Sequence, residues 1–354
     1  MGSKSLLRGS NAVELLSGVD ALYLSGRGSI PVWLLDDLDA LRTQAQESGH
    51  PVDAEIGGYP IRVLGRGWGK YRYCLSHDLA LIGITQSTSL PVVRVQPTAI
   101  AIHALGPETL VLWVRNLLDA AGIDATLGVS RLDLHSDWQG IWIDAEERSS
   151  FVTYSDKRAL YEVSEELSGL NHGQRGGAVY SRIYDKTRES NKEGTDWWPE
   201  LWGDRFDPEQ RVLRVEFEFS RDGLREFAID TPEDAFEQLG PLWAYATGTW
   251  LSLREPTPDA TRSRWPVDPR WAAVQASSLA GGALPAERIK AGKTAGTLRK
   301  LMPQLVGLLT SAAAEVGTRT LDDTIDALAP HIDRYGQQTG TAFHERADEK
   351  WRHR

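Results

Sequence analysis

The chain has 354 residues, 41% of them hydrophobic and 25% charged, which is ordinary for a soluble globular protein with room for two or three domains. Its net charge of −10 argues against a protein that coats nucleic acid, and its single cysteine excludes an internal disulfide and a cysteine-rich zinc site. No apolar stretch approaches the length of a membrane span. We therefore expect a soluble, cytoplasmic protein with no membrane partner.

Residues 1–125 are predicted to form a first unit of sheet and helices. Alternating residues indicate a strand at 19–26, and an amphipathic pattern indicates a helix at 30–48. Further strands are expected at 60–65, 69–76, 80–85 and 91–104. A helix at 107–121 begins with a proline, which is favoured in the first turn.

Residues 126–253 are predicted to repeat this order. The pattern indicates a strand at 129–138, a helix at 146–160, strands at 161–167, 178–187 and 211–220, and a helix from 232 to about 251. Two such units with antiparallel sheets and helices on one side would give an α+β fold. Residues 254–283, rich in Pro and charge at their start, are predicted to be a linker, and residues 284–354 a helical C-terminal segment.

Three of the predicted strands combine one apolar face with one ionic face, because successive side chains of a strand point to opposite sides. The residues on the three ionic faces are Arg131, Asp133, His135 and Asp137; Tyr180, Arg182, Tyr184 and Lys186; and Arg214, Glu216 and Glu218. This set of carboxylates, cations and phenols suits metal-assisted chemistry on a phosphodiester. The alternative is a structural ladder of cross-strand salt bridges.

The scattered positions of the histidines argue against a histidine-rich metal site and favour one made of carboxylates. Eight histidines are scattered along the chain, without an HExxH motif and without two histidines within three residues of each other. We therefore predict that Asp133, Glu216 and Glu218 hold Mg²⁺ or Mn²⁺.

The order RLDLHSDW, GQRGGAVYSRIYDKTRES, LRVEFEF resembles the replication initiation factor family, in an actinobacterial-like branch. Its most specific part is RIYDKT preceded by Gly173, Arg175 and Gly177. The family comprises the trans-acting initiators of rolling-circle plasmids and the relaxases of some integrative conjugative elements. The resemblance implies two TATA-binding-protein-like units and a sequence-specific nickase that attacks DNA through a tyrosine and needs a divalent metal.

In one respect the chain departs from the family pattern, because Asn171 stands where plasmid initiators place the nucleophilic tyrosine. Tyr184 is the first substitute and Tyr180 the second, since both share a face with Arg182 and Lys186, whose charges should favour phenolate. The alternatives are a DNA-binding regulator that does not cleave and a metal-dependent nuclease that uses water.

The expected partner is DNA, as a single-stranded or hairpin origin, with a host helicase and a second copy of the chain as further partner hypotheses. No acidic residue lies between Glu55 and Asp78, where basic and aromatic residues alternate. Such a segment can follow phosphates and stack on bases, or it can be a solvated hairpin. The predicted DNA contacts are Arg131, Arg175, Arg214, Arg66, Lys70 and Trp68.

Overall fold

The computed structural model describes residues 12–164, 166–288, 298–339 and 341–351. The chain divides into two compact units, residues 1–288 and residues 289–354. Residues 1–11 of the first predicted unit and residues 289–297 of the predicted C-terminal segment lie outside the described residues.

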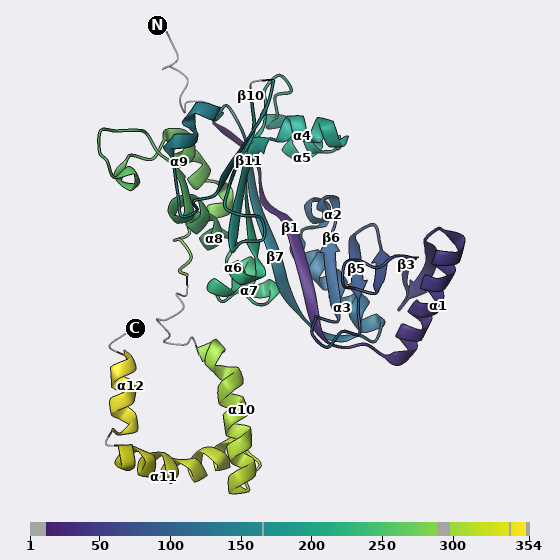
Figure 1. The fold of residues 1–354 in the computed structure, drawn as a ribbon, viewed down its shortest axis with the longest axis vertical. Coiled ribbons are helices and arrows are strands. Elements are labelled where there is room, and N and C mark those ends of the chain that lie inside the picture. Colours follow the sequence, from purple (N-terminus) through teal and green to yellow (C-terminus); the bar gives the residue numbers. More distant parts are fainter. Residues whose placement is uncertain (1–11, 165, 289–297, 340, 352–354) are drawn as a thin grey trace. The chain divides into compact units, whose positions relative to one another are not determined.

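The first compact unit is built on one large antiparallel sheet (Figure 1). Its strands are β1 (Val13–Ser29), β2 (Val52–Ile56), β3 (Tyr59–Leu64), β4 (Tyr73–Ser76), β5 (Ala80–Ile84), β6 (Val93–Pro97), β7 (Asp124–Gln139), β9 (Arg158–Val163), β10 (Glu166–His172), β11 (Val179–Asp185) and β12 (Leu213–Ser220). A separate pair consists of β8 (Phe151–Thr153) and β13 (Leu251–Leu253). The predicted α+β class is therefore confirmed.

The order of the strands shows how the two halves are related. It is β2-β3-β4-β5-β6-β1-β7-β12-β11-β10-β9. The first strand of each half, β1 or β7, pairs with the last strand of that half, β6 or β12. The two first strands pair antiparallel with each other at the centre, so both halves belong to one continuous sheet.

The α-helices of this unit are α1 (Val32–Ser48), α2 (Ala99–Leu105), α3 (Pro107–Ala120), α4 (Lys186–Glu193), α5 (Trp198–Trp202), α6 (Arg221–Glu226), α7 (Pro232–Glu237), α8 (Leu239–Tyr245) and α9 (Pro269–Gln275). Short turns of other helix types are η1 (Ala145–Ser150), η2 (Gly203–Arg205), η3 (Ala246–Trp250), η4 (Arg262–Arg264) and η5 (Ser278–Ala280). Within the segment predicted to be a linker, α9 buries Trp271 and Val274 in the main hydrophobic core.

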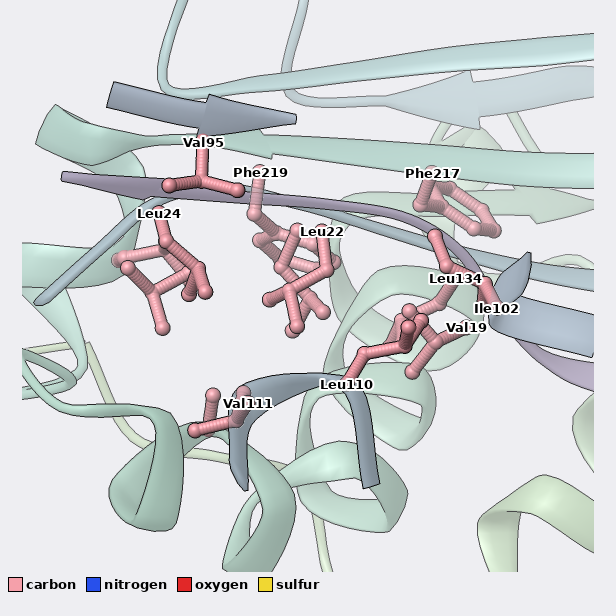
Figure 2. Close-up of a cluster of buried hydrophobic side chains, with 14 of the residues drawn as sticks. Val19, Leu22, Leu24, Val95, Ile102, Leu110, Val111, Leu134, Phe217 and Phe219 are labelled. Atoms are coloured by element: carbon pink, nitrogen blue, oxygen red, sulfur yellow. The ribbon is translucent and has the colours of Figure 1, made fainter. Parts of the chain in front are cut away.

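The main core lies between the apolar face of the sheet and the helices. Figure 2 shows Leu22 and Leu24 of β1 directed toward the residues of α3, where Leu110 is fully buried. The alternation that predicted these strands thus places their apolar side chains inward. The opposite, ionic face is also covered in part, since every residue of β12 except Ser220 is buried.

Several predicted elements differ in the structure. The strand expected at 161–167 spans the end of β9 and the start of β10, and the strand expected at 69–76 begins only at Tyr73. The strand expected at 91–104 ends at Pro97, and α2 follows, because the Thr98 hydroxyl caps the helix by accepting from the Ala101 amide at 3.3 Å. The helix expected at 146–160 is instead η1 followed by β8 and the start of β9. Phe151, Val152 and Thr153, whose bulky or branched side chains favour strands, form β8 there.

The second unit contains α10 (Leu298–Val316), α11 (Leu321–Thr339) and α12 (Phe343–Trp351), which agrees with the helical prediction for this segment. In the part of the chain that the structure describes, no helix combines the length and the apolar character that crossing a bilayer requires.

Candidate functional site

The three ionic strands lie side by side, in the order β7-β12-β11, and their ionic residues share one face. The register places Asp133 opposite Glu218, which faces Tyr180; His135 opposite Glu216, which faces Arg182; and Asp137 opposite Arg214, which faces Tyr184. The period-two prediction for these strands is therefore confirmed. We call this surface, made of those nine residues and Arg131, the ionic face.

At one end of the ionic face, a single arginine joins two buried carboxylates. The Arg131 Nε donates to Asp133 Oδ1 at 2.7 Å, and a terminal nitrogen lies 2.9 Å from Glu218 Oε2. Burial raises the pKa of Asp133 to about 8, with Glu216 and Glu218 adding to the rise and Arg131 opposing it. Two of the three predicted metal ligands are thus held by a guanidinium group.

The third predicted ligand, Glu216, is bound to the neighbouring strand. Arg182 contacts its Oε1, and the Tyr184 hydroxyl donates to its Oε2 at 3.2 Å. Burial, followed by the charge of Asp20, raises the pKa of Glu216. A carboxylate with a raised pKa that accepts from a phenol has the arrangement of a general base and its proton donor.

Cationic neighbours act on both phenols in the predicted direction, but neither pKa is lowered overall. Burial and then Glu216 raise the pKa of Tyr184 well above its usual value, and burial followed by Tyr161 raises that of Tyr180. The cost of burying a negative charge outweighs the attraction of Arg214 at Tyr184 and of Arg182 at Tyr180.

Tyr180 lies beside Asn171, on the neighbouring strand. The Asn171 side-chain amide donates to the Tyr180 hydroxyl oxygen at 2.6 Å. Residue 171 and Tyr180 therefore direct their side chains to the same place, although they are on different strands.

Lys186 does not project beside Tyr184 as a free cation. It is the first residue of α4, is buried, and pairs with Glu189. Its Nζ lies 4.3 Å from the centre of the Trp198 ring and 5.8 Å from that of Tyr184. Lys186 thus holds α4 and α5 against the end of the ionic face.

Arg214, predicted to contact DNA, is fully buried. Its Nε and one terminal nitrogen donate to the two Asp137 oxygens at 2.6 and 2.7 Å, and the other donates to Asp20 at 2.7 Å. Burial disfavours the Asp137 carboxylate, but Arg214 and His135 hold its pKa well below the usual value. Because no surface of Arg214 reaches solvent, its role in this structure is to neutralise buried carboxylates.

Metal-ligating atoms converge at a place that the sequence analysis did not identify. Within the described residues, Asp20 of β1, His103 of α2 and His135 of β7 place ligand atoms within 4.8 Å of one another. Such a triad could hold a metal ion and, unlike the predicted carboxylate set, it includes two histidines. Asp20 and His103 lack a shared sequence signal, because they come from elements that meet only in the folded chain.

The remaining predicted DNA contacts are spread over the surface. Arg66 and Lys70 are exposed between β3 and β4, and Arg175 is exposed between β10 and β11. Trp68 is covered on one ring face by Arg94, whose guanidinium carbon lies 4.2 Å from the ring centre.

Arg131 and Arg94 open onto a basic groove of about 640 Å³. Its arginines are Arg27, Arg94, Arg131, Arg221 and Arg225, and its aromatic residues are Tyr23 and Tyr71. Four of these arginines were missed, because they lie on three separate segments, β1, β6 and α6. A second hollow, of about 420 Å³, lies at Tyr184 and is lined by Asn171, Tyr161, Arg182, Arg188 and Lys192, among others.

Comparison with solved structures finds similarity in fold. A solved structure described as a rolling circle replication initiator protein from Geobacillus stearothermophilus matches with a TM-score of 0.46 and 15% sequence identity, over 77% of this chain and 99% of that chain. No protein-family model matches, and no curated protein matches.

Proposed function

We propose that this chain nicks DNA by tyrosine attack on a phosphodiester, and so initiates rolling-circle replication or transfer of a plasmid or integrative element. The observation that carries the proposal is the hydrogen bond from the Tyr184 hydroxyl to Glu216, beside Arg182 and facing a hollow with further cations. The likeness of the sequence motifs to replication initiation factors supports the same reaction.

The proposed step uses Glu216 as the base. Its carboxylate takes the Tyr184 proton while the phenol oxygen forms a bond to phosphorus, and the bond from phosphorus to the 3′-oxygen breaks. The 3′-oxygen leaves and takes a proton from water, so the products are a 5′-phosphotyrosine and a free 3′-hydroxyl. Arg182, whose Nε has no hydrogen-bond partner, is placed to neutralise the non-bridging oxygens.

The predicted carboxylate ligands do not fit a metal in this structure. Arg131 joins Asp133 to Glu218, and Glu216 is bound by other groups, so the three carboxylates do not converge. A bound Mg²⁺ or Mn²⁺ would supply a Lewis acid to the phosphate, and that cofactor stays a proposal.

DNA is the proposed partner, and the basic groove supports this because arginines beside aromatic rings can hold a phosphate backbone and unpaired bases. A host helicase and a homodimer stay proposals.

The test is to incubate the purified chain with single-stranded DNA and Mn²⁺, trap covalent adducts under denaturing conditions, and map the modified peptide. We expect the adduct on Tyr184, and Tyr184→Phe should abolish it while DNA binding persists. Glu216→Gln should slow adduct formation about 10²–10⁴-fold, the range for loss of a general base. Tyr161→Phe, which alters an exposed tyrosine of the same hollow, is the matched control.

The alternatives give different results. An adduct on Tyr180 would show that Tyr180, and not Tyr184, is the nucleophile. Because of its contact with Asn171, Tyr180 is the next residue to replace by phenylalanine. Nicks without any adduct would favour a water-using nuclease, and binding without nicks a non-cleaving regulator. Either of the last two results would refute the proposed mechanism.

A further inference from the structure

We propose that Asp20, His103 and His135 form a binding site for a divalent transition-metal ion. Their ligand atoms lie within 4.8 Å of one another, and since Asp20 Oδ1 already accepts from Arg214 at 2.7 Å, the other Asp20 oxygen is the one available to the ion. The side chain of His103 is 8% exposed, that of His135 is fully buried, and that of Asp20 is 18% exposed. This site rests on no part of the nicking proposal.

Two unpaired imidazole nitrogens point to a missing ligand. The Nε2 atoms of both His103 and His135 are buried without a hydrogen-bond partner. His103 Nε2 lies 3.8 Å from Asp20 Oδ1, which is too long for a hydrogen bond. Leaving such a group unpaired costs free energy, and a single cation between the two rings would satisfy both nitrogens.

The surrounding groups orient His135 for metal binding. Its Nδ1 lies 3.4 Å from Asp137 Oδ1, and Asp137 is itself fixed by Arg214 and by the Trp202 indole at 2.8 Å. A proton on Nδ1 directed at this carboxylate leaves the Nε2 lone pair for a metal. The same carboxylate–histidine relay orients the ligands of many metal sites.

Local backbone structure brings the carboxylate into place. In the pairing of β1 with β7, Val19 faces Leu134 and Ala21 faces Asp133, so Asp20 is the extra residue of a β-bulge. A bulge redirects a side chain that regular alternation would place elsewhere. His103 reaches the site from the last turn of α2, and Trp198 packs against both histidine rings.

The donor set indicates the class of metal. Two imidazoles and one carboxylate suit Zn²⁺, Mn²⁺ or Co²⁺, whereas Mg²⁺ and Ca²⁺ prefer oxygen ligands. Because His135 faces Glu216 across the strands, a bound metal would lie beside the Tyr184–Glu216 pair.

The test uses the full chain, stripped with EDTA and titrated with Zn²⁺, Mn²⁺, Co²⁺ and Mg²⁺ in a calorimeter. We expect one equivalent of Zn²⁺ or Co²⁺ to bind, with Mg²⁺ at least tenfold weaker. His103→Gln should weaken Zn²⁺ binding at least tenfold. The matched control is His50→Gln, an exposed histidine that should leave binding unchanged. Asp133→Asn should also retain the ion, which separates this site from the predicted carboxylate set.

A second measurement covers the case in which His103→Gln fails to fold. In the unaltered chain, the side-chain nitrogen NMR signals of two histidines should shift when one equivalent of Zn²⁺ is added. The proposal is overturned if the unaltered chain binds no transition metal, if His103→Gln binds as tightly as the unaltered chain, or if no histidine signal shifts. Loss of nicking alone would not bear on it, because the readouts contain no DNA.

Discussion

Replacing Arg214 by methionine tests whether the buried charges of the ionic face depend on this one cation. The substitution keeps most of the side-chain volume but removes three donated hydrogen bonds, at 2.6, 2.7 and 2.7 Å. It leaves Asp137 fully buried without its cation. Breaking a buried ion pair from one side costs about 3–5 kcal/mol, so we expect the free energy of unfolding to fall by that amount.

The assay is urea unfolding at pH 7 in EDTA, with the m-value compared between variants. Arg211→Met is the matched control, because Arg211 precedes β12 and pairs with Glu166 at a half-exposed position. Exposed ion pairs contribute about 0–1 kcal/mol, so the control should lose at most that.

A double variant separates the lost contacts from the stranded charge. Arg214→Met with Asp137→Asn should be more stable than Arg214→Met alone, because the second change removes the unpaired carboxylate and keeps an acceptor for Trp202. The reasoning is refuted if Arg214→Met loses no more than Arg211→Met, or if the double variant is less stable than Arg214→Met alone.

Three further predictions concern acid stability, packing and DNA affinity. Burial lowers the pKa of His172 from 6.5 to about 3, so the unfolded chain takes up a proton that the folded chain excludes, and stability is lost as the pH falls below 6.5. Between pH 6.5 and 5, at 1.36 kcal/mol per pH unit, the unaltered chain should lose about 2 kcal/mol of unfolding free energy that the His172→Phe variant keeps, as measured by urea titrations. Equal losses in the two chains would contradict this prediction. Gly223→Ala would place a Cβ 1.9 Å from the Ala178 carbonyl oxygen and should lower the melting temperature. In the control Gly248→Ala, the new Cβ would lie 4.0 Å from its nearest neighbouring atom, so no steric clash should lower the melting temperature. Arg94→Gln should weaken single-stranded DNA binding and reduce the slope of log affinity against log salt by about 1, and an unchanged slope would remove Arg94 from the proposed DNA contacts.

The sequence by itself determined the local character of the sheet. Alternation at Leu132 and Leu134, and at Val215 and Phe217, is enough to identify strands with one apolar face, because a strand exposes successive side chains to opposite sides. The doubled order of elements likewise predicted two related halves and the α+β class, and the central pairing of β1 with β7 agrees with that order.

The tertiary structure alone decided what the ionic face contacts. Alternation predicts that Arg214 and Glu216 share a side, but it carries no information on whether that side is solvated. α4 and α5 cover its end, with Trp198 stacked 4.2 Å from the Arg214 guanidinium, so Arg214 becomes a buried counter-ion and cannot reach DNA. The same burial raises the pKa of Tyr184, and the neighbouring Glu216 carboxylate adds to the rise.

The possible metal triad depends most completely on folding. Asp20, His103 and His135 come from a bulge, a helix end and a strand that are far apart in the sequence. No spacing rule links such residues, because their distances are set by the pairing of β1 with β7 and the packing of α2 against β1. A sequence pattern records which side chains share an element, whereas only the packed chain determines which elements share a site.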